Sequence, residues 1–148
     1  MRRPFAVPAV VLVALTAVAC GGSARPGSAS PLCSASYEPR ELVESGPLYP
    51  PLPAPGKSRG ETRTTDVAAI KKVVAAACDL PEPPSDVACT AELGPAFALR
   101  FVDTRGQTTD LTAAAYGCQF VEGLDTRRYD ARPLWDALAA AGLPAPRR

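Results

Sequence analysis

The sequence predicts an α+β domain, in which a small antiparallel sheet centred on a β-hairpin is packed by two helices. Apolar residues recur at helical spacing over about 66–79 and about 133–141. Over about 96–115 they instead alternate on both sides of a glycine turn, as expected for a hairpin. The chain also has 17 prolines among 148 residues, which keeps much of the remainder out of helix interiors and central strands.

The first 19 residues have the pattern of an export signal. Arg2 and Arg3 precede residues 5–18, which are nearly all apolar. This run is shorter than the roughly 18–20 apolar residues that span a bilayer, and Ala17-Val18-Ala19 fits a cleavage site. We therefore expect 1–19 to be a signal peptide.

Cys20 follows the cleavage site within LTAVAC-GGS, which resembles the lipobox of bacterial lipoproteins. In that motif the cysteine carries a diacylglyceryl thioether and becomes the mature N-terminus. Cysteine parity agrees, because lipid on one of the five cysteines leaves four for two disulfides. The alternative is a plainly secreted protein whose Cys20 is free or paired with another chain.

The exported part divides by composition. Residues 20–32 are rich in Gly, Ser and Pro, and we expect a lipidated cysteine and a flexible tether. A single domain then covers 33–143, and 144–148 form a disordered tail. Within the domain, 46–56 are proline-rich and read as a stiff connector, the alternative being a PxxP ligand.

The first predicted helix lies between a short strand and a rigid loop. Residues 41–44 could form the strand, and Thr64-Thr65-Asp66 offer side-chain oxygens to cap the helix. Leu80-Pro81 end it. The apolar stripe of this helix comprises Val67, Ile70, Val74 and Ala77.

The hairpin and the last helix have equally clear patterns. Arg105-Gly106 form the turn, and Phe120-Val121 could continue the sheet. Pro133 suits the first turn of a helix, and Gly142 and Pro144 stop it. The buried faces are expected to contain Phe97, Leu99 and Phe101 on one strand, Thr109, Leu111, Ala113 and Ala115 on the next, and Leu134, Trp135, Leu138 and Ala141 on the helix.

Small exported domains with thin cores commonly contain disulfides. The four remaining cysteines allow three pairings. We prefer Cys33 with Cys78, which pins the N-terminal segment to the helix, and Cys89 with Cys118. A hairpin centred near residues 105–106 places residue 118 opposite about residue 93, a few positions from Cys89.

The composition argues against catalysis. With no histidine there is no Ser-His-Asp or Cys-His nucleophile and no imidazole metal site. Asp103 and Asp110 flank the hairpin turn, where such residues usually cap backbone N–H groups. Of the lysines, Lys71 and Lys72 fit a solvated helix face. We therefore expect no catalytic residue, no metal and no cofactor.

Basic residues show no nucleic-acid pattern, since 16 Lys and Arg nearly balance 15 Asp and Glu. Three arginines around Tyr129 could bind a small anion, but we interpret them as a surface turn neutralised by nearby acids. The arginines are Arg127, Arg128 and Arg132, and the acids are Glu122, Asp125 and Asp130.

The chain resembles uncharacterised exported lipoproteins of high-GC Gram-positive bacteria. The resemblance covers the signal and residues 66–143, through DVAAIKKVVAAAC, CTAELGPAFALRF, AAYGCQFV and the Leu/Trp helix. The resemblance implies an extracytoplasmic location, but it implies no biochemical activity. The block from Cys89 to Cys118 is also similar to the subtilisin-inhibitor family, but the first cysteine pair is spaced too widely, and no inhibitory site is carried over.

Together these observations predict an extracytoplasmic lipoprotein on the outer face of the cytoplasmic membrane. Its partners are the membrane, through the lipid, and an unknown protein or small ligand. We expect a non-catalytic binding or envelope-associated module. The alternative is a secreted protease inhibitor, with the rigid loop 81–89 as its candidate segment, and an enzyme ranks third.

Lipidation can be tested by the intact mass of the exported protein. We expect a mature chain that begins at Cys20 and carries the added mass of a diacylglyceryl group, because the lipobox-like motif ends there. The Cys20→Ser variant should lose the modification and the membrane association. An unmodified Cys20 N-terminus on the wild-type protein would contradict the anchor.

Overall fold

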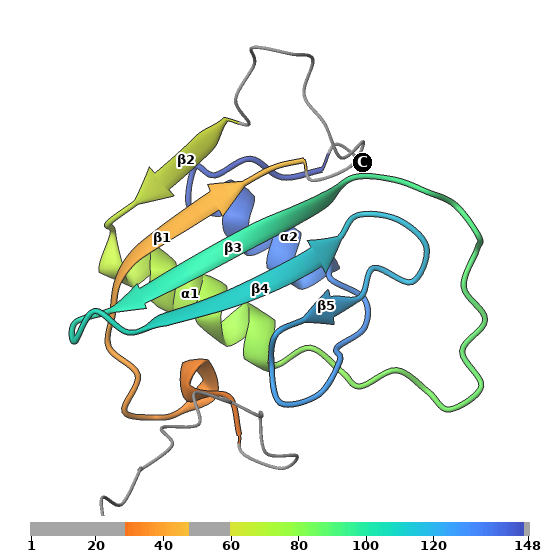
Figure 1. Ribbon diagram of the computed structural model, residues 1–148, viewed down its shortest axis with the longest axis horizontal. Helices are drawn as coiled ribbons and strands as arrows, with labels where there is room; N and C mark the ends of the chain where they lie inside the picture. Colours follow the sequence, from red (N-terminus) through yellow and green to blue (C-terminus); the bar gives the residue numbers. More distant parts are fainter. Residues whose placement is uncertain (1–28, 48–59, 147–148) are drawn as a thin grey trace, which may run out of the picture.

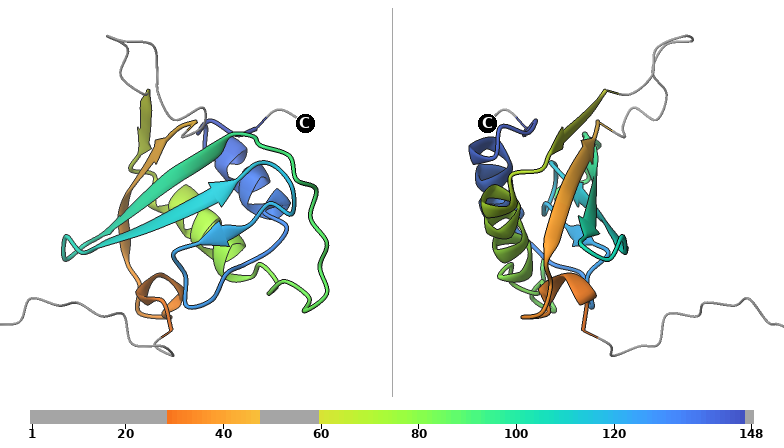
Figure 2. Two further views of the ribbon diagram at one scale, coloured as in Figure 1. Left: turned by 45° about the vertical axis from the view of Figure 1, so that its right-hand side comes forward. Right: turned by 90° about the vertical axis from the view of Figure 1, so that its left-hand side faces the viewer.

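The computed structural model describes residues 29–47 and 60–146, which form a five-stranded antiparallel sheet with two α-helices on one face (Figure 1). Neighbouring strands follow the order β2-β1-β3-β4-β5. The right-hand view of Figure 2 shows the helices as one layer and the sheet as the other. This is the α+β class that the sequence predicts. The expected signal peptide, Cys20 and most of the proline-rich segment 46–56 lie outside the described residues.

The elements have the following bounds in chain order. A 3-10 helix at Pro31–Cys33 precedes β1 (Pro39–Ser45), β2 (Glu61–Thr64), α1 (Val67–Cys78), β3 (Ala96–Asp103), β4 (Thr108–Ala114), β5 (Val121–Glu122) and α2 (Arg132–Ala140).

The hairpin of β3 and β4 is confirmed. Leu99 faces Leu111 across the pair, and Phe97 faces Ala113, so the alternating apolar residues share the covered face. Gly106 has a φ of +79°, a conformation that favours glycine in the turn. The strand predicted near 120–121 also exists as β5, although it is only two residues long.

Strand β1 lies between β2 and β3 in the sheet and extends beyond the predicted residues 41–44. Its Leu42 faces Phe101 of β3, and both side chains are fully buried. On its other side it pairs with β2, which the sequence does not reveal. The reason is that β2 is an edge strand with exposed Glu61 and Arg63, so it has no apolar alternation to detect.

Helix α1 begins where the capping residues predict, but its buried stripe differs from the expected one. Asp66 accepts hydrogen bonds from the backbone N–H groups of Ala68 and Ala69. The buried stripe is Ile70, Val73 and Ala77, whereas Val67 is 42% exposed. Helical side chains lean toward the N-terminus, so that of the first residue projects past the end of the helix.

Helix α2 covers the same face of the sheet. Its Leu134, Trp135 and Leu138 are buried as predicted, with a proline in its first turn. The ring of Trp135 meets that of Phe97 edge to face, with 5.4 Å between centroids. This aromatic contact joins α2 directly to β3.

The two ends of the domain pack more closely than the sequence indicates. Leu32, expected in the tether, is fully buried in the core, and Ser30 is buried beside it. At the other end, Ala145 packs against the core, within the segment expected to be disordered. The composition of these segments does not predict the contacts, because a single apolar residue among Gly, Ser and Pro shows no periodicity.

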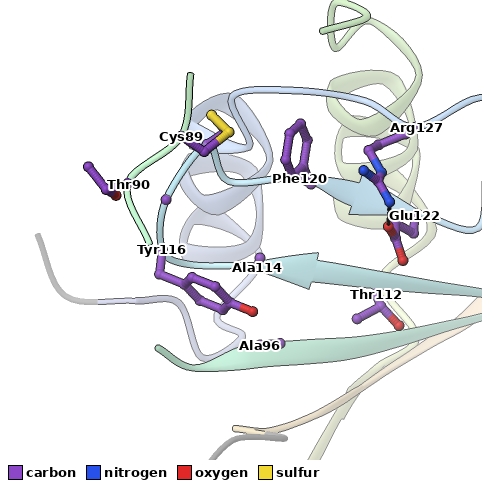
Figure 3. A pocket seen from close by; sticks show the side chains of 11 residues that line it. Cys89, Thr90, Ala96, Thr112, Ala114, Tyr116, Phe120, Glu122 and Arg127 are labelled. Atoms are coloured by element: carbon purple, nitrogen blue, oxygen red, sulfur yellow. Dashed lines mark ion pairs between the residues drawn. A yellow bond between two sulfur atoms is a disulfide. The ribbon is translucent and has the colours of Figure 1, made fainter. Parts of the chain in front are cut away.

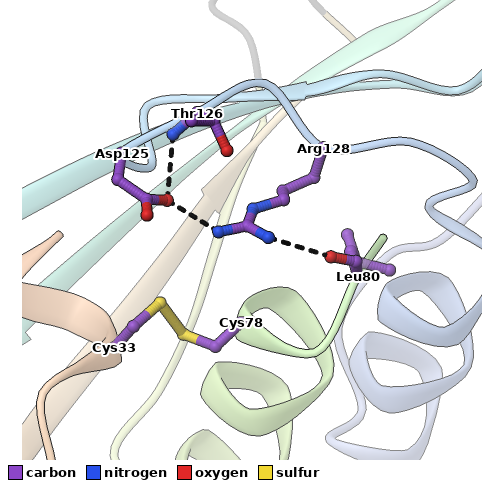
Figure 4. Close-up of a disulfide and its surroundings, with 6 residues drawn as sticks. All are labelled: Cys33, Cys78, Leu80, Asp125, Thr126 and Arg128. Carbon is purple, nitrogen blue, oxygen red and sulfur yellow. Dashed lines mark hydrogen bonds and ion pairs between the residues drawn. A yellow bond between two sulfur atoms is a disulfide. The ribbon is translucent and has the colours of Figure 1, made fainter. Parts of the chain in front are cut away.

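Two disulfides tie the domain together, in the pairing preferred from the sequence. Cys33 bonds to Cys78 and Cys89 bonds to Cys118, with Cα–Cα separations of 5.6 and 5.2 Å. The first joins the N-terminal 3-10 helix to the end of α1 (Figure 4). The second joins the segment before β3 to the segment after β4.

Strand β1 contributes a buried carboxyl group to the covered face of the sheet. Glu44 of β1 is only 2% exposed, and its Oε1 has no hydrogen-bond partner within the described part of the chain. Burial raises the pKa of this carboxyl above its ordinary value, because the charged form loses its hydration. The folded state therefore binds the Glu44 proton more tightly than the unfolded state does. Protonated Glu44 favours folding, and this contribution to the free energy of unfolding is lost as the pH rises through the folded-state pKa.

We expect Glu44→Gln to raise the free energy of unfolding at pH 7.5 by about 1–3 kcal/mol, because the amide keeps the shape without the buried charge. The gain should shrink at pH 4.5, where the wild-type carboxyl binds its proton. Urea denaturation at both pH values measures it. Glu41→Gln, on the opposite face of the same strand, is the control and should show no gain. Equal effects at both pH values would contradict the role of the charge.

Candidate functional site

The arginines predicted to form a surface turn are all paired with acids. Arg127 bonds Glu122, Arg128 bonds Asp125, and Arg132 bonds Asp130, so the charges of the cluster cancel as expected. The hydrogen bond from Arg132 lowers the pKa of the Asp130 carboxyl. A site for a small anion would have to displace these carboxylates.

Arg128 has a structural role beside the first disulfide. It donates to Asp125 at 2.7 Å and to the carbonyl of Leu80 at 3.3 Å (Figure 4). The backbone N–H of Thr126 donates to the same Asp125 oxygen at 2.9 Å. These contacts connect the segment after β5 to the residues that follow α1.

The two turn aspartates do not form a carboxylate pair. Asp103 lies on the covered face and accepts hydrogen bonds from the backbone N–H groups of Arg105 and Gln107, the capping role expected from the sequence. Asp110 lies on the open face, where Arg100 donates to it at 2.8 Å. The sheet therefore separates the two groups.

The lysines and the acidic residues of the described chain also form no catalytic or metal-binding arrangement. Lys71 forms an ion pair with Glu38 at the surface, and Lys72 is exposed. The described residues contain no group of three or more Asp, Glu or Cys that could hold a metal ion. Within the same residues, no helix is both long and apolar enough to cross a membrane.

The loop between Cys89 and β3 is a candidate binding segment, because it is exposed in the middle and fixed at both ends. At its start, Cys89 is bonded to Cys118, and the backbone of Thr90 lies close to Gly117. A Cβ added to Gly117 would be only 3.3 Å from the Thr90 carbonyl oxygen. At its end, the Pro95 carbonyl accepts a hydrogen bond from the backbone N–H of Ala115 at 2.9 Å. We call residues 90–95 the braced loop.

Gly94 explains how the braced loop lies so close to the sheet. A Cβ at this position would lie 2.7 Å from the Cβ of Tyr116, so only glycine fits there without displacing that side chain. One residue earlier, Leu93 is 76% exposed. The only other large hydrophobic residue exposed in the described part of the chain is Val67.

The preceding segment 81–89, our sequence candidate for an inhibitory loop, is held mainly at its start. The backbone N–H of Tyr129 donates to the carbonyl of Pro81 at 2.9 Å, and the hydroxyl of Thr126 donates to Glu82 at 3.0 Å. Its far end is the disulfide at Cys89. Its largest aliphatic side chain, Val87, is half-buried.

Beside the braced loop, the open face of the sheet contains a hollow of about 320 Å³ (Figure 3). Its floor includes Ala96 and Ala114, which face each other across β3 and β4. The rings of Tyr116 and Phe120 stand apart in Figure 3, with Ala114 between them in this view. Thr112 and the Glu122–Arg127 ion pair, at 2.6 Å, lie away from the disulfide.

Sequence reasoning identified neither the braced loop nor the hollow. Tyr116 and Phe120 flank Cys118, which indicated a disulfide and nothing more. The hollow exists because small side chains on two strands meet beneath aromatic residues from the connection to β5. The cross-strand register, which is a tertiary property, brings these residues together.

Comparison with known proteins yields no relative for this chain. No family model, no curated protein and no solved structure matches it. No catalytic family is therefore indicated.

Proposed function

We propose that this chain is an exported lipoprotein, anchored to the outer face of the cytoplasmic membrane through Cys20, whose domain is a non-catalytic module that binds a partner protein. The signal-like residues 1–19 and the lipobox-like motif support export and anchoring. The two disulfides are consistent with this location, since such bonds persist in oxidising compartments.

The observation that carries the binding role is the exposed Leu93 on the braced loop. A single exposed leucine is ordinary on a protein surface. This one, however, is displayed between a disulfide and a strand, so little loop entropy is lost when a partner covers it. An apolar anchor on a constrained loop is a favourable centre for a protein interface.

A photo-crosslinking residue in place of Leu93, in cells that export the protein, tests this role. We expect one discrete product of higher mass, because the partner protein covers this side chain. The matched control is the same residue in place of Val67, which is 42% exposed on α1. No product at position 93, or the same product from both positions, would contradict the proposal.

A protease inhibitor is the second candidate function, and the bracing of the same loop favours it. An inhibitor presents an exposed segment to a protease and holds it rigid, so that the segment binds without being released. Residues 90–95 meet this description more closely than 81–89, because they are fixed at both ends and expose Leu93.

Assays with subtilisin-like and trypsin-like proteases test the inhibitor reading. We expect stoichiometric inhibition of an enzyme that prefers apolar side chains, lost in Leu93→Asp. Gly94→Ala should weaken it, because the new Cβ would displace Tyr116 and loosen the loop. Gly60→Ala is the control, since nothing lies within 4 Å of a Cβ there. Rapid cleavage within 81–95 without loss of protease activity would exclude this function.

A further inference from the structure

The hollow on the open face of the sheet is a second feature that could bind a ligand, independent of Leu93. Its volume of about 320 Å³ lies at the small end of the range of roughly 300–1,000 Å³ found for ligand sites. Its depth comes from Ala96 and Ala114, whose methyl groups leave room where larger side chains would fill it. A ligand about the size of one or two rings matches this space.

The charges of the hollow select against a charged ligand. Glu122 and Arg127 face each other at 2.6 Å, and the arginine also lies 4.9 Å from the centre of the Phe120 ring. The charges of Glu122 and Arg127 therefore neutralise each other within the lining of the hollow. An anion would compete with Glu122 for the guanidinium, and a cation would compete with Arg127 for the carboxylate. A neutral ligand leaves both contacts in place.

The polar groups of the hollow select against a purely apolar ligand. Thr90, Thr112 and Tyr116, whose side chains end in hydroxyl groups, are among the residues that line the hollow, together with the ion pair. A hydrocarbon or a plain aromatic ring would cover some of these groups without offering them a hydrogen bond, which is unfavourable. The ligand should therefore present hydrogen-bonding groups around its edge.

The aromatic side chains complete the description of the ligand. Tyr116 and Phe120 both line the hollow beside its alanine floor (Figure 3), and Arg127 lies over the Phe120 ring. A neutral molecule with hydroxyls at its edge and C–H groups on its faces stacks on aromatic rings while it hydrogen-bonds to polar side chains. A pyranose sugar has this combination. We propose that the hollow is a binding site for a neutral carbohydrate ring.

Saturation-transfer NMR on the full exported chain, in a detergent without sugar groups, tests this assignment. The probes are glucose, galactose, N-acetylglucosamine and cellobiose, with glucuronate and glucosamine as charged analogues and indole as an apolar ring. We expect saturation of the C–H protons of at least one neutral sugar, and at least about tenfold weaker binding of its charged analogues.

Variants separate the hollow from the rest of the open face. Ala96→Leu fills the floor and Tyr116→Ala removes a stacking face, so each should weaken binding about tenfold or more. Ala98→Leu is the matched control, because Ala98 is half-buried on the same face of β3 but does not line the hollow. It should bind as the wild type does. Near-ultraviolet circular dichroism checks that each variant is folded.

One more variant and four possible contradicting results decide the proposal. Leu93→Asp should leave sugar binding unchanged, which distinguishes this site from the protein-binding role of the braced loop. Binding of indole without any neutral sugar, binding of charged sugars only, absence of all binding, or equal binding by Ala96→Leu and Ala98→Leu would each overturn the assignment.

Discussion

The apolar contact between one face of the sheet and the two helices is the interaction on which the rest of the domain depends. Leu42, Leu99 and Phe101 belong to one core cluster with the buried side chains of both helices, and no exposed surface is left on these three residues. Because this contact uses only one face, the other face stays open. The covered face supplies the stability of the domain, and the open face is available for binding.

The two disulfides act on different parts of this arrangement. Cys33–Cys78 joins the entry of the chain to the end of α1, beside Leu32 in the core. It reinforces the packing of α1 against the N-terminal segment, which buried apolar contacts also stabilise. Cys89–Cys118 lies beyond the start of β3 and the end of β4, where the chain on both sides of each cysteine is exposed or half-buried. There it constrains segments that have few apolar contacts of their own, so the braced loop and the hollow both depend on it.

The chain has 31 charged residues, and electrostatic pairing explains why the part that the structure describes shows no strongly charged site. Each arginine near the hollow faces a carboxylate, as Arg127 faces Glu122 and Arg132 faces Asp130. Such pairs at an exposed surface contribute little to stability. Their main consequence is to leave the surface around Cys118 locally neutral, which favours contacts made through shape, aromatic rings and hydroxyl groups.

The amino-acid sequence left the cysteine pairing as a preference among three possibilities, but it was sufficient to predict the class of the fold, the hairpin and both helices. These follow from local rules, since the period of the apolar residues, the cap at Asp66 and the turn at Gly106 depend only on near neighbours. The balance of charges around Arg127 could also be read from nearby acids. Export and lipidation rest on the sequence alone, because Cys20 lies outside the described residues.

The folded structure shows which residues distant in the sequence come into contact. It placed Leu32 in the core, exposed Val67, and added β2 to the edge of the sheet, none of which has a periodic signal. It also brought Ala96 and Ala114 together in a hollow that Tyr116 and Phe120 help to line, and it left Leu93 uncovered. Both candidate binding features arise from contacts between segments distant in the chain. Strand register and disulfide closure set those contacts, and local propensity has no information about them.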